Sequence, residues 1–170
     1  MTKIKICGIT NLEDALSAAR AKVDAIGFVF SDSKRKITPV SARKIISKLP
    51  SSVTKVGVFV NEESEKVNEI IMFCGLDMVQ LHGDESNDYC KKIIKPVIKA
   101  IRVKDLDDIS KIKEYDVHMI LLDTFSKDQY GGTGKTFDWN LAIAAKKYKV
   151  PLILSGGLNI DNLLMAIKKV

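Results

Sequence analysis

Strand-like and helix-like segments alternate along the whole chain, and this alternation restricts the possible folds more than any other feature of the sequence. Short apolar runs are followed by amphipathic runs seven times, with no linker and no change of composition between them. Strict alternation of this kind predicts a parallel sheet covered by helices. We therefore expect a single α/β domain that spans residues 1–170.

The boundaries of the predicted elements follow from the apolar runs and from residues that favour helix ends. Asn11, Asn159, and Thr38 followed by Pro39 are expected to begin helices, and Gly75 is expected to end one. The predicted strands cover residues 3–7, 24–30, 54–60, 77–81, 97–101, 117–122 and 151–154. The predicted helices cover residues 12–20, 39–50, 62–73, 85–94, 106–115, 139–148 and 160–170.

Two architectures fit such a sheet: an open doubly wound sheet and a (β/α)₈ barrel. Open sheets that bind nucleotides carry the pattern G-x-G-x-x-G in the first loop, whereas this chain has CGIT there. Polar, potentially reactive residues at the ends of nearly all strands are typical of the barrel. We therefore predict a fold of the TIM-barrel type, with only seven βα units in this chain. The polar residues at the ends of the predicted strands are Cys7, Ser31, Asn61, His82, Arg102, Asp123 and Ser155.

Composition and charge narrow the possible partners. The net charge of +6 comes mainly from lysines scattered over predicted helices, and no basic stripe with interleaved aromatic residues indicates nucleic-acid binding. A modest positive net charge of this kind is consistent with solvated helix faces or with an anionic small-molecule substrate. No apolar run approaches the roughly 18 residues of a membrane span, and the N-terminal residues resemble a strand rather than a signal peptide. With three cysteines and no C-x-x-C spacing, we expect free thiols and a cytoplasmic protein.

The stretch from Leu121 to Trp139 combines a short apolar run, the carboxylate of Asp123 and a glycine-rich loop. A loop of roughly a dozen residues is long for a compact α/β unit and is usually functional or disordered. A carboxyl group that follows buried residues is partly desolvated, which favours its protonated form and suits a general acid. The alternative is an acid that caps its own loop. The GTGKT motif is not a P-loop, because Gln129 stands where the first glycine is required.

Cys7 is the candidate for a general base. Lys5 and Cys7 share one face of the first predicted strand, and the apolar face with Ile4 and Ile6 is expected to meet the helices. A thiol near an ammonium group ionises more readily and can act as a base. The alternative is an inert core cysteine, and that is the interpretation we give to the two cysteines on predicted helices. These are Cys74 and Cys90.

Two further loops carry groups suited to an anionic ligand. Glycine amides at Gly156 and Gly157, before a predicted helix, suit a phosphate, although a simple tight turn is the alternative. The guanidinium of Arg35 in the second loop suits a carboxylate, and a solvated charge cluster is the alternative. His82 and His118 lack metal-ligand spacing, so no metal site is predicted.

Seven motifs follow one another in the order of a known family: KICGIT, FVF with SKR, VGVFVN, VQLHGDE, LLDT, YGGTGKTFDW and LSGGLN. On these residues the chain, from Lys3 to its end, resembles phosphoribosylanthranilate isomerase of tryptophan biosynthesis. The resemblance implies a (β/α)₈ barrel that converts N-(5′-phosphoribosyl)anthranilate to 1-(2-carboxyphenylamino)-1-deoxyribulose 5-phosphate by an Amadori rearrangement, without a cofactor.

The resemblance also implies a role for each matching residue. Cys7 matches the general base that removes the proton from C2′, and Asp123 matches the general acid that protonates the ribose ring oxygen. Arg35 matches the residue that holds the anthranilate carboxylate. The remaining positions expected to bind the phosphorylated substrate are Gln80, His82, Gly132, Gly156 and Gly157.

One departure from the family pattern leads to a further expectation. The family continues into an eighth strand, a serine–glycine phosphate loop and an eighth helix, whereas this sequence ends at Val170. Seven units alone are expected to leave open strand edges, to associate through them or as a homodimer, and to have little isomerase activity. Two alternatives to the isomerase remain: a phosphosugar lyase with Lys5 or Lys99 as Schiff-base amine, and a non-catalytic remnant that binds a partner through its open edge.

Overall fold

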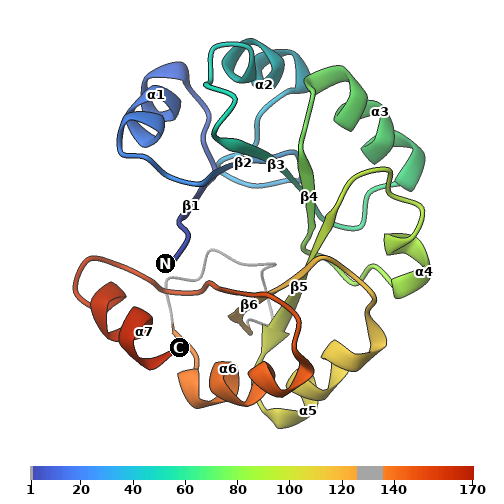
Figure 1. Ribbon diagram of the computed structural model, residues 1–170. Helices are drawn as coiled ribbons and strands as arrows, with labels where there is room; N and C mark the ends of the chain where they lie inside the picture. The colour runs from blue at the N-terminus through green and yellow to red at the C-terminus, as the bar shows by residue number, and fades with distance from the viewer. Residues whose placement is uncertain (1, 126–135) are drawn as a thin grey trace.

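The computed structural model describes residues 2–125 and 136–170. Seven parallel strands form one sheet in the order β1 to β7, as predicted, and curl around a common centre with the helices outside (Figure 1). The strands are β1 (Lys5–Cys7), β2 (Ala25–Val29), β3 (Thr54–Phe59), β4 (Met78–Leu81), β5 (Val97–Val103), β6 (Met119–Thr124) and β7 (Leu152–Leu154). The helices are α1 (Leu12–Arg20), α2 (Pro39–Ile46), α3 (Ser64–Cys74), α4 (Asn87–Cys90), α5 (Leu106–Ser110), α6 (Trp139–Ala145) and α7 (Leu163–Lys169).

Parallel pairing brings the carboxyl ends of all strands to one rim. Cys7 at the end of β1 pairs in register with Gly27, and Arg102 in β5 pairs with Asp123 in β6. Side chains alternate between the two faces of each strand, so each strand contributes to two cores. The inner core includes Val56, Ile98, Ala100 and Leu121. The larger outer clusters, between sheet and helices, include Phe28, Phe59, Leu81, Ile120 and Leu122.

Most predicted helix starts are confirmed. The side chain of Asn11 accepts a hydrogen bond from the amide of Asp14, and Thr38 accepts one from Ser41. Gly75 ends α3 in the left-handed conformation, with φ of 70°. The main correction concerns the last helix, which begins at Leu163 instead of residue 160.

Most of the other predicted helices are also shorter than the apolar periodicity suggested. The second, expected over residues 39–50, covers only Pro39–Ile46. The fourth, expected over residues 85–94, covers only Asn87–Cys90. The fifth and sixth change to short 3₁₀ turns, at Lys111–Glu114 and Lys146–Tyr148. Helix ends commonly tighten in this way because the last carbonyl groups lack α-helical partners.

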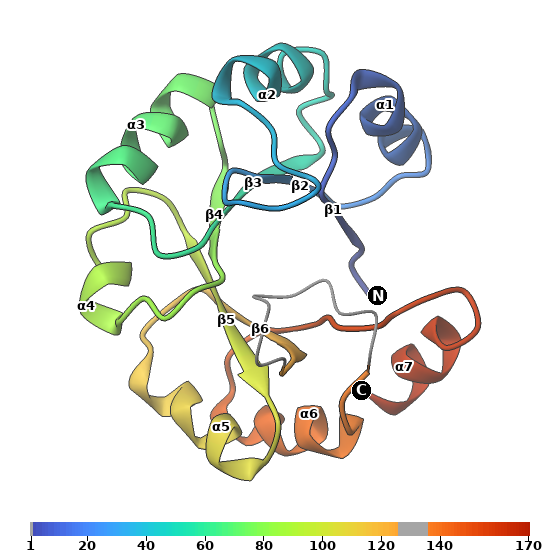
Figure 2. The same cartoon turned by 180° about the vertical axis from the view of Figure 1, so that it is seen from behind.

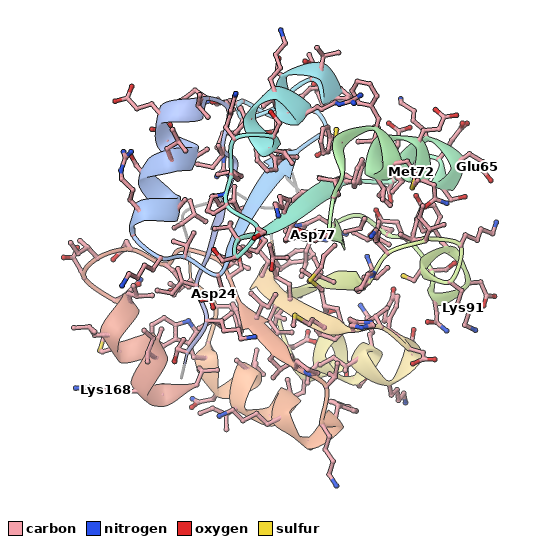
Figure 3. All side chains as sticks on the ribbon, turned by 45° about the horizontal axis from the view of Figure 1, so that its top comes forward. Asp24, Glu65, Met72, Asp77, Lys91 and Lys168 are labelled. Atoms are coloured by element: carbon pink, nitrogen blue, oxygen red, sulfur yellow. The ribbon has the colours of Figure 1, made fainter. Side chains whose placement is uncertain are left out.

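At the opposite rim, two carboxylates tie the beginnings of neighbouring strands together. Asp24 precedes β2 and accepts a hydrogen bond of 2.8 Å from the amide of Ile4, and Asp77 precedes β4 and accepts one of 2.8 Å from the amide of Lys55. Both lie beside the strands, whereas Lys168 points away from the molecule (Figure 3). The acids at this rim therefore serve the pairing of strands.

The two end strands are less covered than the rest of the sheet. Among the described residues, β1 pairs with β2 alone and β7 pairs with β6 alone. Both views place the start of β1 and the end of α7 on the same side of the ring (Figure 2). Ile6 of β1 is 41% exposed, so the prediction that helices cover this face is wrong there. No helix in the described parts of the chain is long and apolar enough to cross a membrane.

Candidate active site

Asp123 lies within β6, not after it as predicted, and points to the inner side of the sheet near the carboxyl rim. Its side chain is buried. One carboxylate oxygen, Oδ1, accepts a hydrogen bond of 2.8 Å from the amide of Thr124. The acid thus makes a local contact of the kind expected for loop capping, but its second oxygen is engaged elsewhere.

A chain of hydrogen bonds links Asp123 to β4. His82 follows that strand directly, and its Nε2 lies 3.1 Å from Oδ2 of Asp123. The other ring nitrogen, Nδ1, lies 2.6 Å from the side-chain Nε2 of Gln80. All three side chains are buried. The resemblance placed Gln80 and His82 in the substrate site. Reasoning from the residues alone missed the contact of His82 with Asp123, 41 residues away, and that of Gln80 with His82.

Gly156 closes the space beside the carboxylate. A Cβ atom at this position would lie 2.8 Å from Oδ1 of Asp123, and the backbone φ is 86°, in the left-handed region. Glycine is therefore required there by both space and conformation. Gly157 also has a positive φ, of 63°, and its carbonyl oxygen accepts a hydrogen bond from Asn162. The two glycines lie in a turn well before α7, so the predicted placement at a helix start is wrong.

Cys7 and Arg35 form a second group at the end of β1. The half-buried thiol of Cys7 fits against Gly27, where a Cβ atom would lie 2.7 Å from Sγ. Arg35 Nη1 donates a hydrogen bond of 2.7 Å to the carbonyl oxygen of Cys7. The arginine side chain also packs on Gly8, which has a φ of 89°. The structure thus brings the loop guanidinium next to the predicted base.

The two groups stay separate in the structure. No hydrogen bond joins the Cys7 group to the Asp123 group among residues 2–125 and 136–170. Gly132, predicted to bind substrate, lies outside the described residues, as does most of its glycine-rich loop. The same described ranges contain no cluster of three or more His, Cys, Asp or Glu side chains that could hold a metal ion.

The other two cysteines are buried on helices, as predicted. Burial raises the pKa of the Cys74 thiol, and it raises the pKa of the Cys90 thiol to about 11. Desolvation penalises the thiolate and so keeps both thiols protonated at neutral pH. They are inert core residues, which leaves Cys7 as the cysteine at the carboxyl rim.

A buried ion pair supports the turn that follows His82. Lys99 points to the outer side of β5, and its Nζ lies 2.8 Å from Oε2 of Glu85 and 2.7 Å from the carbonyl oxygen of Gly83. Glu85 also accepts a hydrogen bond of 2.8 Å from the amide of Asn61. The pair was not predicted, because the sequence places Lys99 and Glu85 on separate elements without a pairing signal.

Comparison with known proteins gives a consistent result. The family model of N-(5′-phosphoribosyl)anthranilate isomerase matches residues 4–170. The isomerase of Geotalea uraniireducens is 51% identical over 168 residues, which cover 98% of this chain and 82% of the relative. Mutually generated monomers of the dimeric phosphoribosylanthranilate isomerase from Thermotoga maritima align with a TM-score of 0.89 and 44% identity, over 100% of this chain and 83% of that one. A phosphoribosylanthranilate isomerase in complex with reduced 1-(o-carboxyphenylamino)-1-deoxyribulose 5-phosphate aligns with a TM-score of 0.87 and 44% identity, over 100% and 83% of the two chains.

Proposed function

Because this chain belongs to the N-(5′-phosphoribosyl)anthranilate isomerase family, we propose that it catalyses the Amadori rearrangement of N-(5′-phosphoribosyl)anthranilate in tryptophan biosynthesis. The product is 1-(2-carboxyphenylamino)-1-deoxyribulose 5-phosphate. The observation that carries the proposal is a buried carboxyl group and a half-buried thiol at strand ends of one rim, on residues that match the family motifs. This geometry supports general acid–base catalysis.

Asp123 acts as the general acid in the first step. It gives a proton to the ribose ring oxygen, the bond between that oxygen and C1′ breaks, and the nitrogen lone pair forms the C1′=N bond of a Schiff base. Burial suits Asp123 to this role, because it keeps bulk water away from the proton transfer.

Cys7 acts as the general base in the second step. Its thiolate takes the proton from C2′, and the electrons of that C–H bond form the C1′=C2′ bond while the Schiff-base nitrogen gains electron density. The resulting enolamine carries a hydroxyl group on C2′ and tautomerises to the ketone. The position of Cys7 at the end of β1 leaves its thiol half-buried and available to the substrate.

Arg35 binds the anthranilate carboxylate beside the base. A guanidinium group presents two parallel N–H donors to a planar carboxylate, and Arg35 already contacts the Cys7 backbone. The backbone amides around Gly156 and Gly157 bind the substrate phosphate. Arg35→Ala is therefore expected to raise KM more than it lowers kcat.

The lyase alternative is less consistent with the structure. Lys99 is ion-paired with Glu85 and lies on the outer face of β5, away from the inner side where Asp123 points. Lys5 remains the only one of the two proposed amines on the inner face of its strand. The family match favours the isomerase over this chemistry.

The test is a direct assay of the protein with N-(5′-phosphoribosyl)anthranilate, in which the change of anthranilate fluorescence reports turnover. A parallel sample receives borohydride, which reduces a protein–substrate Schiff base to a stable adduct. The isomerase is expected to turn over substrate and to gain no adduct mass. A covalent adduct on Lys5, or the absence of turnover, would contradict the proposed function.

We further place the protein in the cytoplasm and propose that it self-associates into a homodimer. The cytoplasmic location is supported by the thiol base and the three unpaired cysteines, which suit a reducing compartment.

The homodimer is supported by the similar phosphoribosylanthranilate isomerase of Thermotoga maritima, which is dimeric. The surface for a second copy is the apolar side of α7, where Leu164 is 70% exposed. Leu164→Lys is expected to lower the sedimentation coefficient to that of a monomer.

A further inference from the structure

Gln80 is a buried polar residue that the proposed reaction steps do not use. It lies on the inner face of β4, is 2% exposed, and pairs in register with Val58 and Ile98. Its only side-chain hydrogen bond among the described residues is the 2.6 Å contact with Nδ1 of His82. Its oxygen, Oε1, is buried and has no partner there. An unsatisfied buried carbonyl group is costly, so the placement of this amide requires an explanation.

The direction of the amide determines where the proton of His82 resides. The nitrogen of a carboxamide can only donate, so Nδ1 of His82 must accept. A neutral imidazole then carries its proton on Nε2. That N–H group faces Asp123 and donates to Oδ2 at 3.1 Å. The Gln80 amide therefore selects the tautomer in which His82 is a donor to the acid.

The consequence for Asp123 concerns how its carboxyl group is held. Oδ2 is occupied as the acceptor of the histidine N–H. Oδ1 accepts a hydrogen bond of 2.8 Å from the amide of Thr124 and lies against Gly156. The donor at Nε2 thus adds the second of two hydrogen bonds that fix the orientation of the carboxyl group.

We propose that Gln80 is a positioning residue which fixes His82 as the Nε2–H tautomer and so holds the carboxyl group of Asp123 in place through Oδ2. The inference rests on the proposed function, because it takes Asp123 as the acid. In this role Gln80 does not bind the substrate itself. It acts through His82, so its replacement is expected to lower kcat and to leave KM unchanged. Oε1 of Gln80 is left without a partner because the amide is turned so that its nitrogen donates to the His82 ring.

The first experiment reads the tautomer directly by ¹⁵N NMR of histidine-labelled protein without substrate. The chain has two histidines, and His118 is exposed, so its signals serve as an internal reference. The His82 ring in the parent protein is expected to carry its proton on Nε2. In Gln80→Glu, which keeps the shape of the side chain but replaces the amide donor by a carboxylate acceptor, Nδ1 is expected to become protonated. A parent ring protonated on Nδ1, or an unchanged ring in Gln80→Glu, would overturn the proposal.

The second experiment compares kinetics. Gln80→Glu and Gln80→Met are each expected to lower kcat about tenfold, the effect of one lost buried hydrogen bond, with KM unchanged. Ile98→Val alters packing at the same level of the sheet without removing a hydrogen bond and is the control, with kcat close to the parent value. Unchanged kcat in both Gln80 variants, or a rise in KM alone, would overturn the proposal. The NMR result needs no turnover, so an inactive parent protein would contradict the proposed function without deciding the tautomer.

Discussion

The middle of the sheet and its two end strands are built differently. In β6, five of six residues are buried, and Ile120 is completely covered. In β1 and β7, which have three residues each, no residue is buried. A strand paired on both sides is shielded along both edges and packed on both faces, whereas an end strand has one paired edge. Burial in this molecule therefore follows the number of paired neighbours more than the hydrophobicity of the strand.

The residues of the candidate active site also fall into two groups, one on the well-covered strands and one on an end strand. Asp123, His82 and Gln80 belong to the well-covered strands and are joined by hydrogen bonds. Cys7 stands at the end of β1, supported by its pairing with Gly27 and by the contact with Arg35. The proposed acid thus has surroundings that the sheet fixes, while the proposed base is positioned by fewer contacts.

The largest expected effect comes from breaking the buried ion pair in the well-covered part. Lys99→Met leaves the carboxylate of Glu85 buried without its cation, which is expected to cost about 3–5 kcal/mol in the free energy of unfolding. Urea denaturation measures this change. Lys91→Met is the control, because Lys91 and Asp88 form an exposed pair whose loss is expected to cost less than about 0.5 kcal/mol. Equal costs for the two variants would contradict the contrast between core and surface.

A matched pair of isoleucines compares the two regions of the sheet directly. Ile120→Ala removes a side chain with 0% exposure from β6 and is expected to cost about 2–5 kcal/mol. Ile6→Ala removes the same atoms from β1, where the side chain is 41% exposed, and is expected to cost less than about 1 kcal/mol. Thermal or urea unfolding of both variants measures the difference. If Ile6→Ala were as destabilising as Ile120→Ala, β1 would be as well packed as β6.

Thiol reactivity gives a smaller but site-resolved contrast. The raised pKa of Cys90, about 11, means that its thiol is protonated at pH 8 and ionises only as the pH rises towards 11. Cys74 is also buried with a raised pKa. Iodoacetamide at pH 8 is therefore expected to alkylate Cys7 first and the other two only after unfolding, which peptide mass spectrometry can quantify. Early labelling of Cys90 would show that its helix opens in the native state.

Much of this molecule could be predicted from local sequence patterns. The seven strands, their parallel order and the caps at Asn11 and Thr38 follow from periodicity and from side chains that bond to their own backbone neighbourhood. The end of β6 was missed because Asp123 is polar, although pairing with β5 continues the strand through Thr124. The start of α7 was missed because the Asn159 side chain accepts from Asp161 and Asn162 and forms a turn instead of a cap.

The site was predictable only in part, for a physical reason. Individual positions such as Cys7, Arg35 and Asp123 could be named from motifs and strand ends. The hydrogen bonds that join β4 to β6, and the ion pair between Lys99 and Glu85, depend on the register of strands and on side-chain direction. These contacts connect residues distant in sequence, and no local pattern marks them.

The central claim, that Cys7 and Asp123 are the two proton-transfer groups, is tested most directly by steady-state turnover of N-(5′-phosphoribosyl)anthranilate. Cys7→Ala and Asp123→Asn are each expected to lower kcat by about 10² or more, a typical contribution of general acid–base catalysis. Cys90→Ala, a cysteine removed from the core instead of the rim, is the matched control and should retain kcat near that of the parent. Near-normal turnover in either Cys7→Ala or Asp123→Asn would contradict the account and remove that residue from the mechanism.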